Sequence, residues 1–249
     1  MIQGVGAFGT SPNPQIEMLA KHYTCLTFDN RGIGGSLPTG RPLTVEQMAK
    51  DSLALLDEVG WETAHVVGHS LGGLTAMQLA LNAKHRVRTL TLLCAFARGS
   101  DAVVITPELV WIILRIKFGL RFLRRQAFLE MVLAPEERRG NMRKVAERLA
   151  GVLGHDVADI PAITNQQVAA MRSHDLTKRL HELAGIPTLV INGEKDPLAR
   201  PESGRALAEG IPGARYVEFP ATSHALPILQ DARCARLILD HLDRFEAQA

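Results

Sequence analysis

The pentapeptide Gly68-His69-Ser70-Leu71-Gly72 is the sequence feature that most limits the fold. It joins an apolar run typical of a strand, Thr63–Val67, to a helix-like run from Leu71 to Leu81. A serine at such a junction sits on a sharp turn, and the flanking glycines let the strand and helix backbones pass closely. We therefore expect Ser70 to lie just beyond a strand end, where its hydroxyl can react.

The rest of the chain alternates between strand-like and helix-like runs. This alternation predicts an α/β fold, with a mostly parallel sheet flanked by helices. A polar cap at Thr44 and a glycine at position 60 bound one amphipathic helix, for example. The expected strands are Tyr23–Phe28, Thr63–Val67, Val87–Phe96, Pro187–Asn192 and Ala214–Phe219. The expected helices are Thr44–Val59, Leu71–Leu81, Glu202–Glu209 and Pro227–Phe245.

The middle of the chain has a different character. Residues 97–185 lack convincing strands and contain several helical patterns, so we expect an inserted helical cap there. Residues 1–96 and 186–249 would then form the sheet-containing core. Gly119 interrupts one helical pattern and is expected to split it, because glycine costs about 1 kcal/mol relative to alanine inside a helix.

The segment from Leu109 to Leu129 combines basic and apolar residues. It holds five basic residues and no acidic one, which we interpret as a solvated face rather than a membrane contact. The apolar face, with Trp111, Ile112 and Phe118 nearby, would suit the roof of a pocket for an acyl or aromatic group. The basic residues are Arg115, Lys117, Arg121, Arg124 and Arg125.

Two candidate residues, both much later in the chain, could activate Ser70. A serine hydroxyl needs a base to take its proton, and the base needs a partner that holds its tautomer. In sheets of this kind such groups lie on loops after strand ends. His224 follows the expected strand 214–219, and Asp196 follows the expected strand 187–192. Glu194 and Asp101 are the alternative carboxylates.

Together these motifs resemble the α/β-hydrolase superfamily, and more closely its capped esterases, lactonases and C–C hydrolases. The resemblance implies that Ser70 is the nucleophile, His224 the general base and then acid, and Asp196 the orienting carboxylate. It requires no cofactor and no metal. His69 would pack or hydrogen-bond locally, and Asp29 and Arg31 would brace their loop. The matching segments are Asp29-Asn30-Arg31-Gly32-Ile33-Gly34-Gly35-Ser36, Gly68-His69-Ser70-Leu71-Gly72-Gly73, Gly193-Glu194-Lys195-Asp196 and Ser223-His224.

The resemblance also predicts an oxyanion hole made of two backbone N–H groups. One would come from Leu71, directly after the nucleophile. The other would come from Val5, in a segment, Gln3-Gly4-Val5-Gly6, that matches the glycine loop of relatives. Gln3 replaces the familiar histidine, so we expect different hydrogen bonding in this loop but the same backbone donor.

The predicted activity is hydrolysis of a small or medium carboxylic ester through an acyl-enzyme on Ser70. Hydrolysis of lactones or enol-lactones, C–C bond hydrolysis and perhydrolysis could use the same three residues. A ligand receptor with little turnover is the alternative outside enzymes. A serine at position 70 argues against dehalogenase or epoxide hydrolase chemistry, since those relatives use a carboxylate there.

Composition limits which partners the protein could bind and in which compartment it would be found. A net charge of +2 over 249 residues argues against a dedicated nucleic-acid binder. Cys25, Cys94 and Cys234 lie far apart in apolar runs, which is typical of reduced core thiols. No stretch reaches the roughly 20 apolar residues of a membrane span, so we expect a cytoplasmic protein that acts on small molecules.

The amino terminus departs from the resemblance. Relatives carry about two further strands, and most of a third, before the glycine loop that begins here at Gln3. We expect either a fragment of a longer enzyme or a sheet that has lost an edge. In both cases an unpaired strand edge would favour aggregation.

Overall fold

The computed structural model describes residues 1–38, 40, 42–102 and 106–247. Their strands form one parallel sheet, ordered as in the chain. Because all strands run the same way, their carboxyl ends meet at one edge. This confirms the predicted α/β fold. The strands are β1 (Ala64–His69), β2 (Val87–Leu93), β3 (Thr188–Gly193) and β4 (Arg215–Phe219).

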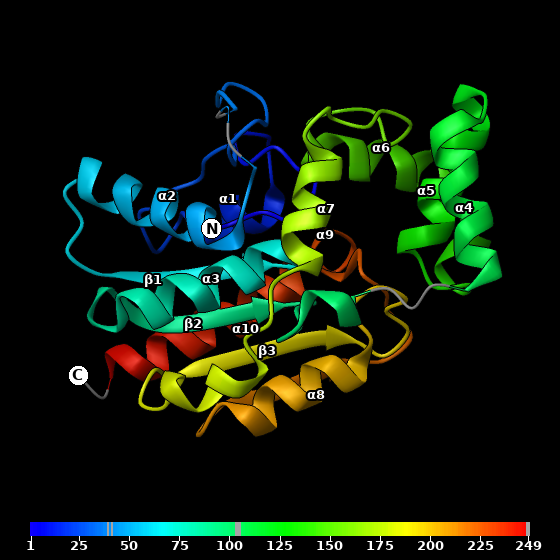
Figure 1. The fold of residues 1–249 in the computed structure, drawn as a ribbon. Helices are drawn as coiled ribbons and strands as arrows, with labels where there is room; N and C mark the ends of the chain where they lie inside the picture. The colour runs from blue at the N-terminus through cyan, green and yellow to red at the C-terminus, as the bar shows by residue number, and fades with distance from the viewer. Residues whose placement is uncertain (39, 41, 103–105, 248–249) are drawn as a thin grey trace.

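Helices cover both faces of the sheet (Figure 1). On one face, α3 (Leu71–Asn82) packs on β1 and β2, with α2 (Val45–Glu58) beside it, and α8 (Pro201–Gly210) packs on β3 and β4. On the other face lie α10 (Asp231–Glu246) and its neighbour α1 (Pro14–Leu19). Short 3-10 helices span Lys84–Arg86, Gly99–Asp101, Glu137–Arg139 and Thr177–Leu183.

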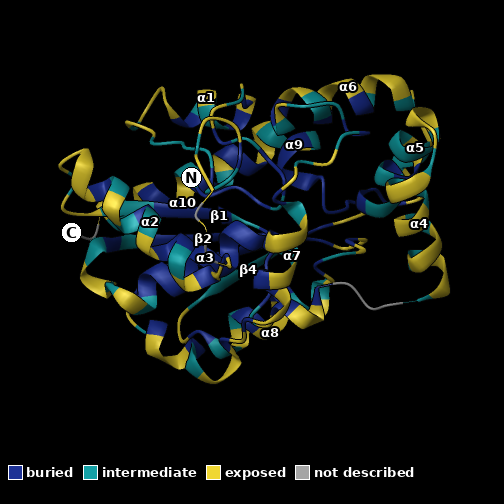
Figure 2. Cartoon of the chain, turned by 45° about the horizontal axis from the view of Figure 1, so that its top comes forward, coloured by how far each residue is buried: buried dark blue, intermediate teal, exposed yellow. Residues whose placement is uncertain are grey.

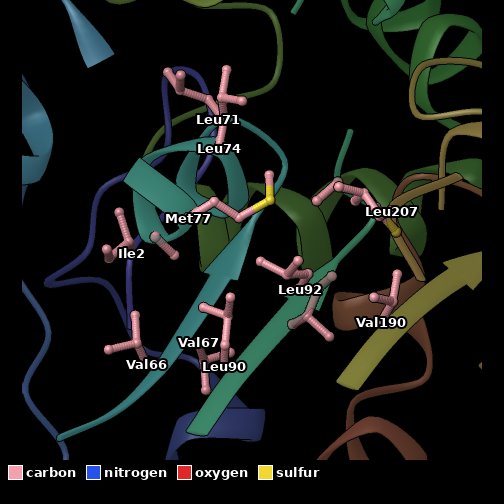
Figure 3. Packing of buried hydrophobic residues seen from close by; sticks show 14 of the residues in the cluster. Ile2, Val66, Val67, Leu71, Leu74, Met77, Leu90, Leu92, Val190 and Leu207 are labelled. Atoms are coloured by element: carbon pink, nitrogen blue, oxygen red, sulfur yellow. The ribbon is translucent and has the colours of Figure 1, made fainter. Parts of the chain in front are cut away.

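The core lies on both faces of the sheet, and one part of it lies between the sheet and α3. Strand β2 is buried along nearly its whole length, as expected for a parallel strand covered on both faces. Figure 3 shows how apolar side chains from α3 meet those of the strands, which fixes the start of α3 against the end of β1. The contributing side chains include Val66, Val67, Leu71, Leu74, Met77, Leu90 and Leu92.

Between β2 and β3 the chain forms helices α4 (Pro107–Phe118), α5 (Arg121–Val132), α6 (Met142–Leu153) and α7 (Thr164–Arg172). Leu133 and Leu149 belong to a small apolar cluster that reaches Ala225 and Ile228 of the core. Gly119 separates α4 from α5, as predicted, and a Cβ there would lie 2.4 Å from the Arg115 carbonyl oxygen. The residue boundaries proposed for a cap domain remain a prediction.

Much of the α4 and α5 hairpin is exposed (Figure 2), and some of its exposed residues are apolar. Trp111 is 62% exposed and Phe118 is 81% exposed, so both are largely open to solvent rather than packed over the sheet. Basic side chains of the hairpin pair with acidic ones: Arg121 with Asp159, and Arg125 with Asp156. In the described part of the chain, no helix is both long and apolar enough to cross a bilayer.

The predicted strand Tyr23–Phe28 is wrong. Among the described residues this segment pairs with no strand, and a cavity of about 450 Å³ is lined by both this segment and β1. A strand forms only when a neighbour lies close enough for backbone hydrogen bonds, about 4.8 Å away. Cys25 is consequently exposed, contrary to the expectation of a buried thiol.

Two element boundaries also differ from expectation. The predicted helix Pro227–Phe245 is divided at Gln230 into α9 (Leu226–Leu229) and α10. Strand β2 ends at Leu93 rather than Phe96, because Cys94 adopts a positive φ of 47° that turns the chain out of the sheet.

Candidate active site

Ser70 occupies a strained turn between β1 and α3. Its φ of 55° and ψ of −120° lie outside the regions that residues with a side chain ordinarily adopt. A Cβ on Gly68 would lie 2.3 Å from the Gly72 oxygen, and one on Gly72 would lie 2.1 Å from the Ile2 oxygen. Both glycines are therefore required by the close passage of backbones, which is the reason the sequence pattern suggested.

Hydrogen bonds hold this turn in place. The Ser70 N–H donates to the Leu93 oxygen over 2.9 Å, which ties the turn to the end of β2. Leu71 is the first residue of α3, so its own N–H has no acceptor within the helix. That leaves a backbone donor next to Ser70, at the position predicted for the oxyanion hole.

Asp196 and His224 lie in contact beyond the ends of β3 and β4. His224 Nδ1 is 2.8 Å from Asp196 Oδ2, and the two residues are 8% and 3% exposed. A carboxylate only accepts hydrogen bonds, so this contact places the imidazole proton on Nδ1 and leaves Nε2 as the basic nitrogen. The other oxygen, Asp196 Oδ1, accepts from the N–H groups of Leu198 at 2.8 Å and Ala199 at 2.9 Å.

The alternative carboxylates have other partners. Glu194 is exposed and accepts from the Ala221 N–H over 2.8 Å, so it braces the loop that carries His224. Asp101 is exposed in a 3-10 helix beside Arg98. Of the three carboxylates, the structure brings Asp196 against His224.

His69 brings His224 next to the Ser70 turn. The two imidazole rings lie with their centroids 5.1 Å apart, and His69 directly precedes Ser70. Burial, together with the neighbouring His224, lowers the pKa of His69 to about 3, so this ring is neutral. Among the described residues no hydrogen bond joins the Ser70 hydroxyl to His224.

The glycine loop at Gln3–Gly6 passes directly beside the nucleophile. A Cβ on Gly4 would lie 3.2 Å from the Ser70 Cβ. The loop is joined to the edge of β1, because the Ile2 N–H donates to the Val67 oxygen over 2.8 Å. Asn30 Nδ2 donates to the Gln3 oxygen over 3.1 Å. Nothing in the described part of the chain accepts the Val5 N–H, the second donor predicted for the oxyanion hole.

Residues from the helical segment hold the same loop, and sequence reasoning missed them. Gln167 of α7 accepts the Gly6 N–H at Oε1 over 2.8 Å, and His155 Nε2 lies 3.0 Å from the Gly6 oxygen. Gln167 is fully buried. The only hint in the sequence is a pair of glutamines on one helix, which does not show which of them faces inward.

Asp29 and Arg31 brace their loop, as expected. Asp29 Oδ1 accepts from the Thr10 N–H over 3.1 Å, and Oδ2 accepts from the Gly35 N–H over 3.1 Å. Arg31 Nε donates to Asp51 over 2.8 Å, which anchors the loop to α2. Neither side chain contacts the Asp196–His224 pair.

The profile of the α/β-hydrolase fold matches residues 2–231. The chain belongs to this family. Proteins named carbamate hydrolase RutD are among its relatives. The one from Azorhizobium caulinodans is 31% identical over 222 residues, which are 89% of this chain and 82% of the relative.

Solved structures of this family superpose well. The enol-lactonase of Burkholderia xenovorans LB400 has a TM-score of 0.78 and 28% identity, over 97% of this chain and 89% of that one. A thermophilic esterase from Thermogutta terrifontis has a TM-score of 0.79 at 24% identity, over 98% of this chain and 88% of that one. The latter likeness supports the fold alone.

Proposed function

We propose that this α/β hydrolase cleaves a small or medium carboxylic ester through an acyl-enzyme on Ser70. The observation that carries the proposal is the buried hydrogen bond from His224 Nδ1 to Asp196, with the His224 ring beside the Ser70 turn. This arrangement leaves Nε2 free to accept a proton, which is what a serine nucleophile requires.

The reaction runs in two halves. Ser70 Oγ attacks the ester carbonyl carbon while His224 Nε2 takes the hydroxyl proton. The oxyanion is held by the N–H groups of Leu71 and Val5. His224 then gives its proton to the departing alcohol as the C–O bond breaks. His224 then takes a proton from water as the water oxygen attacks the acyl carbon. The bond from Ser70 Oγ to the acyl carbon breaks, the His224 proton passes to Ser70 Oγ, and the acid leaves.

Cyclic esters and carbamates are the second candidate. Both carry a carbonyl that Ser70 could attack in the same way. The similarity to an enol-lactonase over 97% of the chain supports the lactone, and the RutD relatives support the carbamate. The likeness to a C–C hydrolase from Rhodococcus sp. strain RHA1, at 20% identity, supports the fold alone.

Turnover of a graded series of p-nitrophenyl esters, one enol-lactone and one carbamate tests the proposal. We expect hydrolysis of short or medium esters, and Ser70→Ala should lower kcat by about 10⁴-fold or more. Ester turnover that survives in Ser70→Ala would contradict the mechanism. A folded chain that turns over only the lactone or the carbamate would replace the ester assignment and retain the residues.

A further inference from the structure

Three metal-ligating side chains meet beside the Ser70 turn. The donor atoms of His69, Cys94 and His224 all lie within 4.8 Å of one another. They come from the ends of β1, β2 and the loop after β4, and the proposed hydrolysis uses only His224. Cys94 is buried and forms no disulfide.

One of these donors has an unsatisfied ring nitrogen, and the other two lie against Asp196. His69 Nε2 is buried and has no hydrogen-bond partner among the described residues, which is costly for a polar atom. The backbone of Cys94 has a positive φ of 47°, directly after the last residue of β2. Burial and the nearby Asp196 carboxylate raise the pKa of the Cys94 thiol well above its usual value, so the free protein keeps it protonated.

The charge around the three donors favours a cation. Asp196 contributes a carboxylate that hydrogen-bonds His224. A thiolate at Cys94 would add a second negative charge, which a divalent ion would balance. Two imidazole nitrogens and one thiolate sulfur bind zinc in preference to calcium or magnesium, which favour oxygen ligands.

We propose that His69, Cys94 and His224 bind a thiophilic divalent cation such as Zn²⁺ and that this ion inhibits the enzyme. Zinc lies about 2.0 Å from nitrogen and about 2.3 Å from sulfur, so tetrahedral ligands are about 3.3 to 3.7 Å apart. The donor atoms, which lie within 4.8 Å of one another, would move closer by about 1 to 1.5 Å to reach these spacings. Binding forms a metal–sulfur bond and releases the Cys94 proton to water.

Inhibition follows from occupation of His224. If the ion takes Nε2, the base can no longer accept the Ser70 proton. If it takes Nδ1, the hydrogen bond to Asp196 is lost. Only the inhibition rests on the proposed function, since binding requires the three donors alone.

A Cd²⁺ titration of the full chain tests binding without reference to activity. Cadmium bound to a thiolate absorbs in the ultraviolet, so the wild-type chain should develop this band. Cys94→Ser should lose it, while Cys25→Ser, which removes an exposed thiol, should retain it. His69→Asn, which keeps all three thiols, should shift the titration to higher Cd²⁺ and covers the case in which Cys94→Ser does not fold.

Zn²⁺ inhibition then tests the consequence. Loss of an outer-shell partner already weakens metal binding 10 to 100-fold, so loss of the Cys94 ligand should raise the inhibitory concentration by at least about 100-fold. A wild-type chain without the thiolate band, or a band that survives in Cys94→Ser, overturns the site. A band without inhibition of an active enzyme overturns the inhibitory role.

Discussion

The sheet-bearing part of the chain and the helical segment between β2 and β3 are built differently. The sheet belongs to one large apolar cluster to which every strand contributes. Helix α4 has no buried residue, and the helical segment's separate cluster is small. The strand ends carry Ser70, Asp196 and His224, whereas the helical segment reaches the site through Gln167 and His155.

The two regions contribute to the candidate active site in different ways. The residues proposed to attack the substrate or to transfer protons lie at or just beyond the strand ends, next to the large apolar cluster. The helical segment instead fixes the backbone of one loop. We therefore expect substitutions at strand ends to act on chemistry, substitutions at Gln167 to act on loop position, and substitutions on the α4 surface to act on neither.

After Ser70, the largest expected effect is at Asp196. Asp196→Asn should lower kcat by about 10³ to 10⁴-fold, because an amide that donates to Nδ1 would move the imidazole proton to Nε2. Steady-state ester hydrolysis measures this loss. Glu194→Gln is the matched control and should change kcat little, since Glu194 is exposed and accepts one loop N–H. Equal losses in both variants would refute the choice of carboxylate.

Core packing should give the next largest effect. Leu92 is fully buried in β2, so Leu92→Ala should lower the free energy of unfolding by about 2 to 5 kcal/mol. Urea denaturation followed by circular dichroism measures it. A loss below about 1 kcal/mol would mean that the sheet is looser than this packing implies.

Gln167 should show a smaller, kinetic effect. Gln167→Leu removes the acceptor of the Gly6 N–H, and a displaced glycine loop should lower kcat by about 10 to 100-fold with little change in KM. Gln167→Glu keeps an acceptor oxygen and should restore part of the activity. Gln166→Leu, on the exposed neighbour, is the control. A rise in KM without a fall in kcat would instead indicate a role in substrate binding.

The smallest effect is expected on α4. Phe118 is 81% exposed, so Phe118→Ser should change the unfolding free energy by no more than about 0.5 kcal/mol. The same urea experiment compares it with Leu92→Ala. A loss as large as that of the core variant would show that the hairpin is buried in solution.

Local sequence was enough to predict the features that depend on neighbours in the chain. Gly68 and Gly72 mark the turn at Ser70, and the loops after two apolar runs supplied Asp196 and His224. The parallel sheet flanked by helices followed from the alternation of strand-like and helix-like runs. Gly119 was recognised as a break because glycine acts on its own helix.

Features that depend on distant partners were not predictable. Tyr23–Phe28 has a strand-like sequence, but no strand in the described part of the chain forms hydrogen bonds with it. Gln167 and Gln166 are identical in type, and tertiary packing decides which one meets Gly6. The sequence predicted Cys94 to be a core thiol. Its position near two histidines depends on three strands that end at the same edge of the sheet, which the sequence around Cys94 does not show.

The two hydrogen bonds on Gly6 have a consequence for chimeric enzymes. A helical segment transplanted from a relative would bring its own α7, and with it a new partner, or none, for the Gly6 backbone. Such a chimera could fold on the intact sheet and still turn over poorly. The helical segment and the Gln3–Gly6 loop are therefore best exchanged together, and a graft that includes this loop with its matching α7 should outperform one that exchanges the helices alone.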